Sequence, residues 1–192
     1  MTPRAEIVHW LFATGFLLLG QYLLAEAVVG QEVWRKRRWR VYLWPGLAFA
    51  LGVLLWPVAV FFTSSTLHML AHASWAETAM LAGTTQLALA RGRLESRWWT
   101  LAVSLSMLVS GAAFLIHEQN PWLFSRSAFL HHALGWTLVV AALFPVGQAI
   151  RPRSFAWNAG FATTWLVMAV LLYCDRDVAP IFGHLSPLAG AR

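Results

Sequence analysis

Histidine is the residue type in this chain whose number and placement suggest chemistry. The seven histidines are His9, His68, His72, His117, His131, His132 and His184. A neutral imidazole nitrogen is the commonest protein ligand for transition metals, and it is also an axial ligand of haem iron. A cluster of imidazoles would therefore predict a metal or haem site, provided that the fold brings them together.

Spacing within the sequence indicates which histidines can act together. His68 and His72 are four residues apart, so on a helix they share one face and can be offered to one metal ion. His131 and His132 are adjacent, and successive helical residues diverge by about 100°, so only one of the two is expected to point inward. The residues that we predict as metal ligands are His68, His72, His117, His131, His132 and His9.

Two carboxylates are candidates for a supporting role. Glu118 follows His117 directly and could ligate the metal or hydrogen-bond to a ligand. Glu77 lies inside an apolar segment, where acidic residues are functional candidates by default. Its angular offset from His72 is about 140° on a helix, so it does not share the face of the histidine pair. A structural hydrogen bond between helices is an equally good explanation for Glu77.

The elements that must position these side chains are membrane-spanning helices. The chain is 59% hydrophobic and only 11% charged, whereas soluble domains carry roughly 25% charged residues. A helix that crosses a bilayer needs about 20 apolar residues. We therefore expect an all-α, single-domain bundle of six transmembrane helices, with a kink at Pro145 and a short outer tail from 175 to 192. The six spans lie at about 7–29, 41–62, 66–90, 98–116, 129–150 and 155–174.

Basic residues give the direction of the spans. Most of the positive charge lies in three loops that fall on the same side of a six-span bundle, at 35–40, 91–97 and 151–153. By the positive-inside rule this side is the cytoplasm, so both termini face the periplasm or the extracellular space. All seven histidines then lie at or just inside the outer membrane face. We therefore attribute the net charge of +6 to basic loops that orient the spans in the membrane, and not to nucleic-acid binding.

Further signals narrow the class of protein. Cys174 is the single cysteine, so neither an internal disulfide nor a thiolate metal cage is expected. The first apolar run lacks the features of a cleaved signal peptide and is expected to stay as a span. The sequence contains no Walker loop, nucleophile elbow or C-x-x-C-H haem attachment motif, and it specifies no reaction.

The order of these features resembles a known family. A histidine precedes a glycine-containing first span (His9 to Gly20), and another opens the third span (His72 to Gly83). A Phe-x-x-His element, Phe114 to His117, leads through a polar loop to paired histidines. This pattern resembles the transmembrane protein 45 family and its bacterial relatives of unknown function. The resemblance implies a multi-pass fold with family-level histidines, and we expect a bacterial inner-membrane location; it supplies no activity.

Three functions fit these observations. The first is a membrane protein that binds copper or zinc at the outer face, in metal handling or metal-dependent chemistry. The second is a b-type cytochrome subunit in quinol-linked electron transfer; with all histidines at one depth, at most one haem fits. The third is a non-catalytic accessory subunit that contacts partner membrane subunits. The lipid bilayer is a partner in all three.

Overall fold

The computed structural model of the protein describes residues 5–61, 66–116 and 125–174. Every element in these ranges is helical, which confirms the all-α prediction. The α-helices are α1 (Ala5–Val29), α2 (Gln31–Arg35), α3 (Leu43–Phe61), α4 (Thr66–Ala90), α5 (Leu101–Ile116), α6 (Ser125–Ala141), α7 (Leu143–Ile150) and α8 (Phe155–Tyr173). Two short 3-10 helices, η1 (Arg38–Tyr42) and η2 (Arg97–Thr100), precede α3 and α5.

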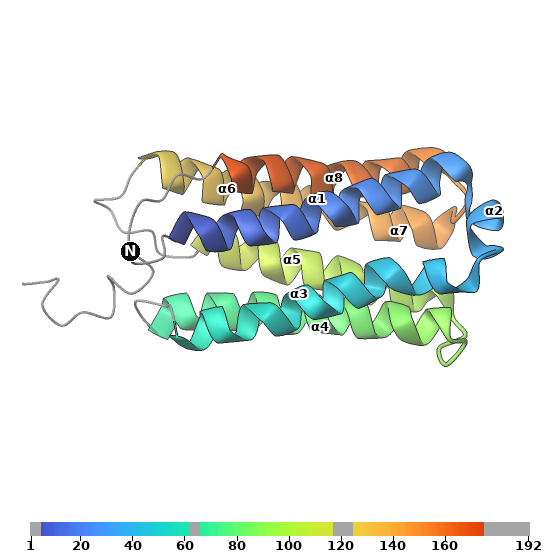
Figure 1. Ribbon diagram of the computed structural model, residues 1–192, viewed down its shortest axis with the longest axis horizontal. Helices are drawn as coiled ribbons and strands as arrows, with labels where there is room; N and C mark the ends of the chain where they lie inside the picture. Colours follow the sequence, from blue (N-terminus) through green and yellow to red (C-terminus); the bar gives the residue numbers. More distant parts are fainter. Residues whose placement is uncertain (1–4, 62–65, 117–124, 175–192) are drawn as a thin grey trace, which may run out of the picture.

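The long helices run side by side along the length of the molecule and alternate in direction (Figure 1). The segment containing α2 and η1, the loop from α4 to η2, and the loop from α7 to α8 all lie at one end, which we call the arginine end. The starts of α1, α4 and α6 lie at the opposite end, which we call the histidine end. The separation of basic loops from the histidine-bearing helix ends therefore agrees with the sequence prediction.

Among the described residues, five helical segments are long and apolar enough to cross a membrane. They comprise Ile7–Val29, Arg38–Phe61, Arg97–Ile116, Phe129–Ile150 and Phe155–Tyr173. The chain is thus an integral, multi-pass helical membrane protein. Helix α4 has 25 residues and lies alongside the other long helices, but it is too polar to be among these candidates. The length and composition of α4 therefore do not show that it is the sixth predicted span.

The helix that was expected to kink at Pro145 is interrupted just before it. Helix α6 ends at Ala141 and α7 begins at Leu143. A proline lacks the N–H for a bond to the carbonyl four residues earlier, and its ring clashes with that carbonyl, which here belongs to Ala141. The break lies where this clash requires it.

Small residues bring the helices into close contact. Helix α3 packs most extensively on α4, and α1 packs on α8. A Cβ atom at Gly83 of α4 would lie 2.7 Å from the backbone nitrogen of Phe49 and from the carbonyl oxygen of Pro45. A Cβ atom at Gly52 of α3 would lie 2.7 Å from the carbonyl oxygen of Ala76. Backbone therefore meets backbone between these helices, which is how membrane helices gain van der Waals contact.

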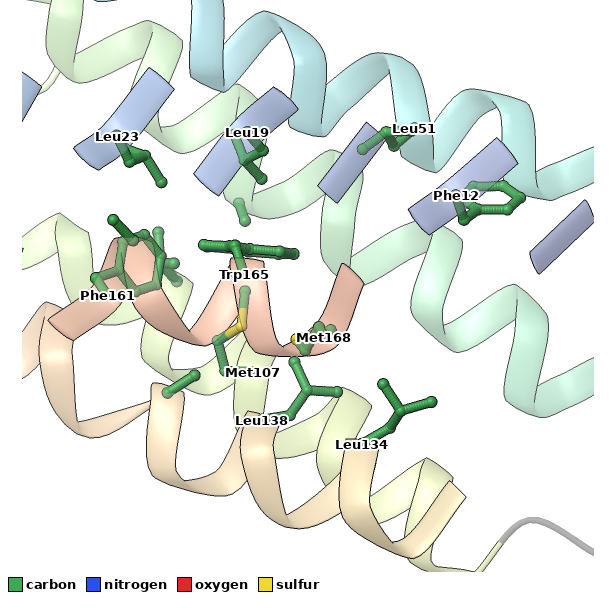
Figure 2. Close-up of a cluster of buried hydrophobic side chains, with 14 of the residues drawn as sticks. Phe12, Leu19, Leu23, Leu51, Met107, Leu134, Leu138, Phe161, Trp165 and Met168 are labelled. Atoms are coloured by element: carbon green, nitrogen blue, oxygen red, sulfur yellow. The ribbon is translucent and has the colours of Figure 1, made fainter. Parts of the chain in front are cut away.

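Large apolar side chains from several helices fill the middle of the bundle. Phe161, Trp165 and Met168 of α8 project toward the side chains of α1, α5 and α6, as Figure 2 shows. Phe161 and Trp165 meet edge to face, with ring centroids 6.0 Å apart. This core fixes how each helix is rotated about its axis, and so decides which side chains face inward at the two ends.

Candidate functional site

A row of stacked rings crosses the histidine end of the bundle. The His72 and Trp75 ring centroids on α4 are 4.7 Å apart. Trp75 stacks on Phe114 of α5 with a centroid separation of 3.9 Å and an angle of 17° between the ring planes. Phe114 in turn contacts His131 of α6, at 5.7 Å between centroids. The row therefore connects imidazoles of α4 and α6 through one aromatic pair.

Hydrogen bonds hold the centre of this row in place. Nε1 of Trp75 donates to the carbonyl oxygen of Ser110 at 3.1 Å. The hydroxyls of Thr78 and Ser110 hydrogen-bond at 2.7 Å, and Thr78 Oγ1 also contacts the carbonyl oxygen of Trp75 at 3.1 Å. These bonds join α4 to α5 directly beside the stacked rings. The ring of Trp75 is thereby oriented, which in turn limits the orientations available to His72.

The structure shows which of the two adjacent histidines of α6 faces the interior of the bundle. His131 is partly buried and packs against Phe114, whereas His132 is exposed. The angular divergence of successive helical residues requires that one point outward once the other points inward. His131 is therefore the histidine of this pair that belongs to the interior of the bundle.

His9 of α1 belongs to the same end of the molecule. It is partly buried and lies one turn before Phe12. His72 likewise precedes Trp75 by three residues, and Phe114 precedes His117 by three residues in the sequence. Residues three apart on a helix are neighbours on its surface. On α1 and α4, therefore, a histidine stands about one turn from an aromatic residue.

Phe12, Trp75 and Phe114 share a further property, since all three line one internal chamber of about 80 Å³. Its walls are apolar except for three hydroxyl residues. Ser106 Oγ donates to the carbonyl oxygen of Ala102 at 2.8 Å, and the other two hydroxyls, on Thr78 and Ser110, pair with each other. Nε1 of Trp165, which also lines the chamber, is buried and has no hydrogen-bond partner among the described residues, so the chamber wall carries one unsatisfied donor.

The structure describes only some of the remaining predicted site residues. The side chain of His68, all of His117 and Glu118, and the tail with His184 lie outside the described residues. Glu77 is exposed on the outer surface of α4, in the middle of this helix, and does not point to the chamber. The prediction that Glu77 lies on a different face from His72 agrees with this position.

The described residues contain no complete set of metal ligands. Within 5–61, 66–116 and 125–174, no group of three or more histidine, cysteine, aspartate or glutamate side chains lies close enough together to hold a metal ion. Of the six predicted ligands, the side chains of His9, His72, His131 and His132 are described, whereas the side chain of His68 and all of His117 are not. The predicted metal site therefore stays a prediction.

No family model matches the chain. No curated protein and no solved structure matches it either. The resemblance to the transmembrane protein 45 family is thus neither supported nor contradicted, and the site must be argued from its own geometry.

Sequence analysis singled out Phe114 for its spacing to His117, but it did not identify the ring contacts of His72 with Trp75 and of His131 with Phe114. Trp75 was part of an apolar run in which aromatic residues are common. The signal that could have found it is the three-residue spacing from His72, which recurs from His9 to Phe12 on another helix. That spacing becomes informative only when these helices are known to be neighbours.

Proposed function

We propose that this chain is a six-span membrane protein that binds a transition-metal ion, copper or zinc, in the histidine layer at its outer end. The observation that carries the proposal is the ring row from His72 to His131. It brings imidazoles of α4 and α6 to the same aromatic pair, at the end of the bundle away from the basic loops. Copper and zinc both accept imidazole nitrogen as a ligand.

In this proposal His68 and His117 supply the further ligands. His68 is four residues before His72, and His117 is three residues after Phe114, so each is one helical turn or less from a member of the ring row along the sequence. His9 adds a fourth helix to the layer. An open coordination position on such a metal would allow it to activate water, although the chain specifies no substrate.

Helix α4 completes the six spans in this proposal. Its 25 residues extend about 37 Å at 1.5 Å per residue, which exceeds the roughly 30 Å hydrocarbon core. Ser74 Oγ donates to the carbonyl oxygen of Ala71 at 2.8 Å, and Thr78 is bonded as described above. These hydroxyls are therefore satisfied within the protein, which makes a polar span tolerable in lipid. With six spans, the positive-inside rule puts both termini outside.

The size of the chamber favours a single ion over haem. At about 80 Å³ the chamber beneath the histidine layer is far smaller than a porphyrin. A b-type haem would need the helices of the ring row to separate.

A second candidate, an accessory subunit of a membrane complex, is favoured by Glu77. Its side chain is exposed in the middle of α4, where it would face lipid. An acidic group in this position is costly, and a polar group from a partner subunit would offset the cost. The two candidates are compatible, because Glu77 and His72 are on different faces of α4.

The test is the metal content of the detergent-purified full chain, measured by elemental analysis for copper, zinc and iron. We expect about one copper or zinc per chain. His72→Ala and His131→Ala should each lower the metal content and affinity at least tenfold, since the loss of a residue that only supports a ligand already costs about 10–100-fold. The matched control is His132→Ala, which removes an exposed imidazole from the neighbouring position and should retain the metal.

Three outcomes would contradict the metal proposal. One is a chain without copper or zinc when purified in the absence of chelators. Another is equal metal retention by His131→Ala and His132→Ala. The third is stoichiometric iron with a Soret absorption band, which would indicate haem. The first outcome, with unchanged stability of the histidine variants, would leave the accessory subunit as the better proposal.

A further inference from the structure

A second cavity opens at the arginine end, and its volume is about 650 Å³. We call it the vestibule. It lies between the last turns of α1 and α4, the short helices α2, η1 and η2, the end of α7 and the beginning of α8. Ligand-binding pockets in proteins typically measure about 300–1,000 Å³, so the vestibule is large enough for an organic molecule.

Charged and amide side chains from separate segments converge on the vestibule. The cations are Arg35 of α2, Arg38 of η1 and Arg97 of η2, and the acidic residues are Glu26 and Glu95. Four amide side chains also line it, contributed by Gln31, Gln86, Gln148 and Asn158. Three guanidinium groups, each with five donors, outnumber the two carboxylates, so the lining has a net positive charge that suits a phosphate or carboxylate group.

Several of the polar groups are already oriented by the fold. Gln86 Nε2 of α4 donates to Oγ1 of Thr100 at 3.3 Å, which ties α4 to η2 across the wall of the vestibule. Asn158 Nδ2 donates to the carbonyl oxygens of Pro152 and Ser154, each at 2.9 Å. The segments that border the vestibule are therefore joined to one another by hydrogen bonds.

Several basic residues at this end have structural partners, including two that line the vestibule: the guanidinium of Arg97 lies 5.8 Å from the centroid of the Trp98 ring, and Arg35 interacts electrostatically with Glu26. Arg153 forms an ion pair with Glu32 at 2.9 Å, which joins the α7–α8 loop to α2. The guanidinium of Arg40 lies over the Trp34 ring, 4.6 Å from its centroid, while its carbonyl accepts from the Tyr22 hydroxyl. Among the described residues, Arg38 forms no ion pair with a carboxylate. Its charge is available for a ligand.

The floor of the vestibule is apolar and adjoins the internal chamber. Trp44 and Val103 line both cavities. Phe161 also lines the vestibule and meets Trp44 edge to face, with centroids 6.3 Å apart. Moving from the arginine end toward the centre, a ligand would therefore meet guanidinium and amide donors, then an aromatic floor, then an apolar chamber.

We propose that the vestibule binds the phosphate headgroup of an anionic amphiphile, with its hydrocarbon portion against Trp44 and Phe161. Arginine binds phosphate through paired N–H donors, which suits three arginines around one anion. The apolar floor selects for a hydrocarbon-bearing molecule over free phosphate. The vestibule also lies at the end where the positive-inside rule puts the cytoplasmic leaflet, whose anionic lipids carry such headgroups. This proposal is independent of the metal site.

Binding of a short-chain lipid to the detergent-purified full chain tests the proposal. The probe is dioctanoyl phosphatidic acid in a non-ionic detergent, followed by native mass spectrometry and by quenching of tryptophan fluorescence. We expect saturable binding of one lipid per chain. The double variant Arg38→Gln, Arg97→Gln should weaken this binding roughly tenfold or more, because two charged hydrogen-bond donors are lost.

The matched control is the double variant Arg37→Gln, Arg93→Gln. It removes the same number of charges from the same two loops, at exposed residues that do not line the vestibule. Its affinity should stay within about twofold of the parent chain, since neither guanidinium group lines the vestibule. All four positions are exposed, so neither variant disturbs the core.

Three results would overturn the proposal. Equal weakening by both double variants would indicate general attraction of lipid to basic loops. Equal affinity for dioctanoylglycerol, which lacks the phosphate, would indicate that the arginines do not recognise the headgroup. Inorganic phosphate that competes at the same concentration as the lipid would indicate a site for free phosphate and no role for the apolar floor.

Discussion

At the scale of single residues, the histidine end and the arginine end differ in how their polar side chains are used. The imidazoles of His72 and His131 contact aromatic rings, His72 edge to face and His131 tilted, so these ring contacts help to fix their positions. The vestibule arginines instead line an open space with amide neighbours. Rigid support at one end and an accessible surface at the other suit a small ion and a larger ligand, respectively.

Trp75 is the central residue of the ring row, because its indole contacts both His72 and Phe114. Replacing it by phenylalanine keeps an aromatic ring against Phe114 but removes the hydrogen bond to the Ser110 carbonyl. We expect Trp75→Phe to lower the free energy of unfolding by about 1 kcal/mol, the typical net contribution of such a bond. Chemical unfolding in mixed micelles would measure the difference.

Trp99→Phe provides the comparison for this variant, because Trp99 is 52% exposed at the beginning of the α5 region. It should change stability by no more than a few tenths of a kcal/mol, as exposed substitutions usually do. Equal stabilities for the two variants would mean that the indole N–H does not contribute to holding α4 against α5.

At the scale of elements, the pairing of α3 with α4 decides where a polar helix can lie in the bundle. Gly52 and Gly83 let the two backbones approach each other. Helix α4 is thereby held with His72 and Trp75 toward the bundle and Glu77 toward the outside. The same rotation of α4 about its axis therefore turns His72 toward the bundle and leaves the carboxylate of Glu77 exposed.

Substitution of Gly83 by alanine tests this pairing. The new methyl group would lie 2.7 Å from backbone atoms of α3, and backbone cannot move aside as a flexible side chain can. We expect a loss of roughly 1–3 kcal/mol, the usual cost of overpacking, and a lower apparent melting temperature in detergent.

Gly46→Ala is the control, since a Cβ atom at this α3 position meets nothing within 4 Å. Alanine is also the better helix former by about 1 kcal/mol, so this variant should be neutral or slightly more stable. A Gly83→Ala protein as stable as Gly46→Ala would show that α3 and α4 can separate without cost.

At the scale of the whole molecule, the bundle has two unlike ends joined by an apolar interior. Basic loops gather at one end, and histidine-bearing helix ends gather at the other (Figure 1). Between them lies a chamber of about 80 Å³, lined by residues of α1, α3, α4, α5, α6 and α8, beside the packed side chains that Figure 2 shows. A metal ion at one end would thus be separated from the vestibule at the other, and continuous transport between them is not expected in this conformation.

Labelling with a membrane-impermeant maleimide tests the orientation of the bundle. Cys174 follows α8 directly at the histidine end and is exposed, so it should react in intact cells. In a Cys174→Ala background, a cysteine introduced at Arg93 should react only after the membrane is opened, because this loop carries the charges that stay inside. The opposite labelling pattern would show that the histidine layer faces the cytoplasm.

The sequence alone determined the helical class, the boundaries of the long segments and the separation of histidines from arginines. These properties follow from the local cost of placing apolar, polar and charged groups in lipid, which each segment meets largely by itself. The break before Pro145 is local in the same sense, because the proline acts on a carbonyl of its own helix.

Only the tertiary structure decided which side chains meet. His131 faces inward and His132 outward, Glu77 faces away from the bundle, and Trp44 separates the vestibule from the chamber. Each of these facts depends on how a helix is rotated against neighbours that are distant in the sequence. That rotation is set by close packing, such as the backbone contacts at Gly83, and packing between distant segments cannot be read from the periodicity of a nearly uniformly apolar helix.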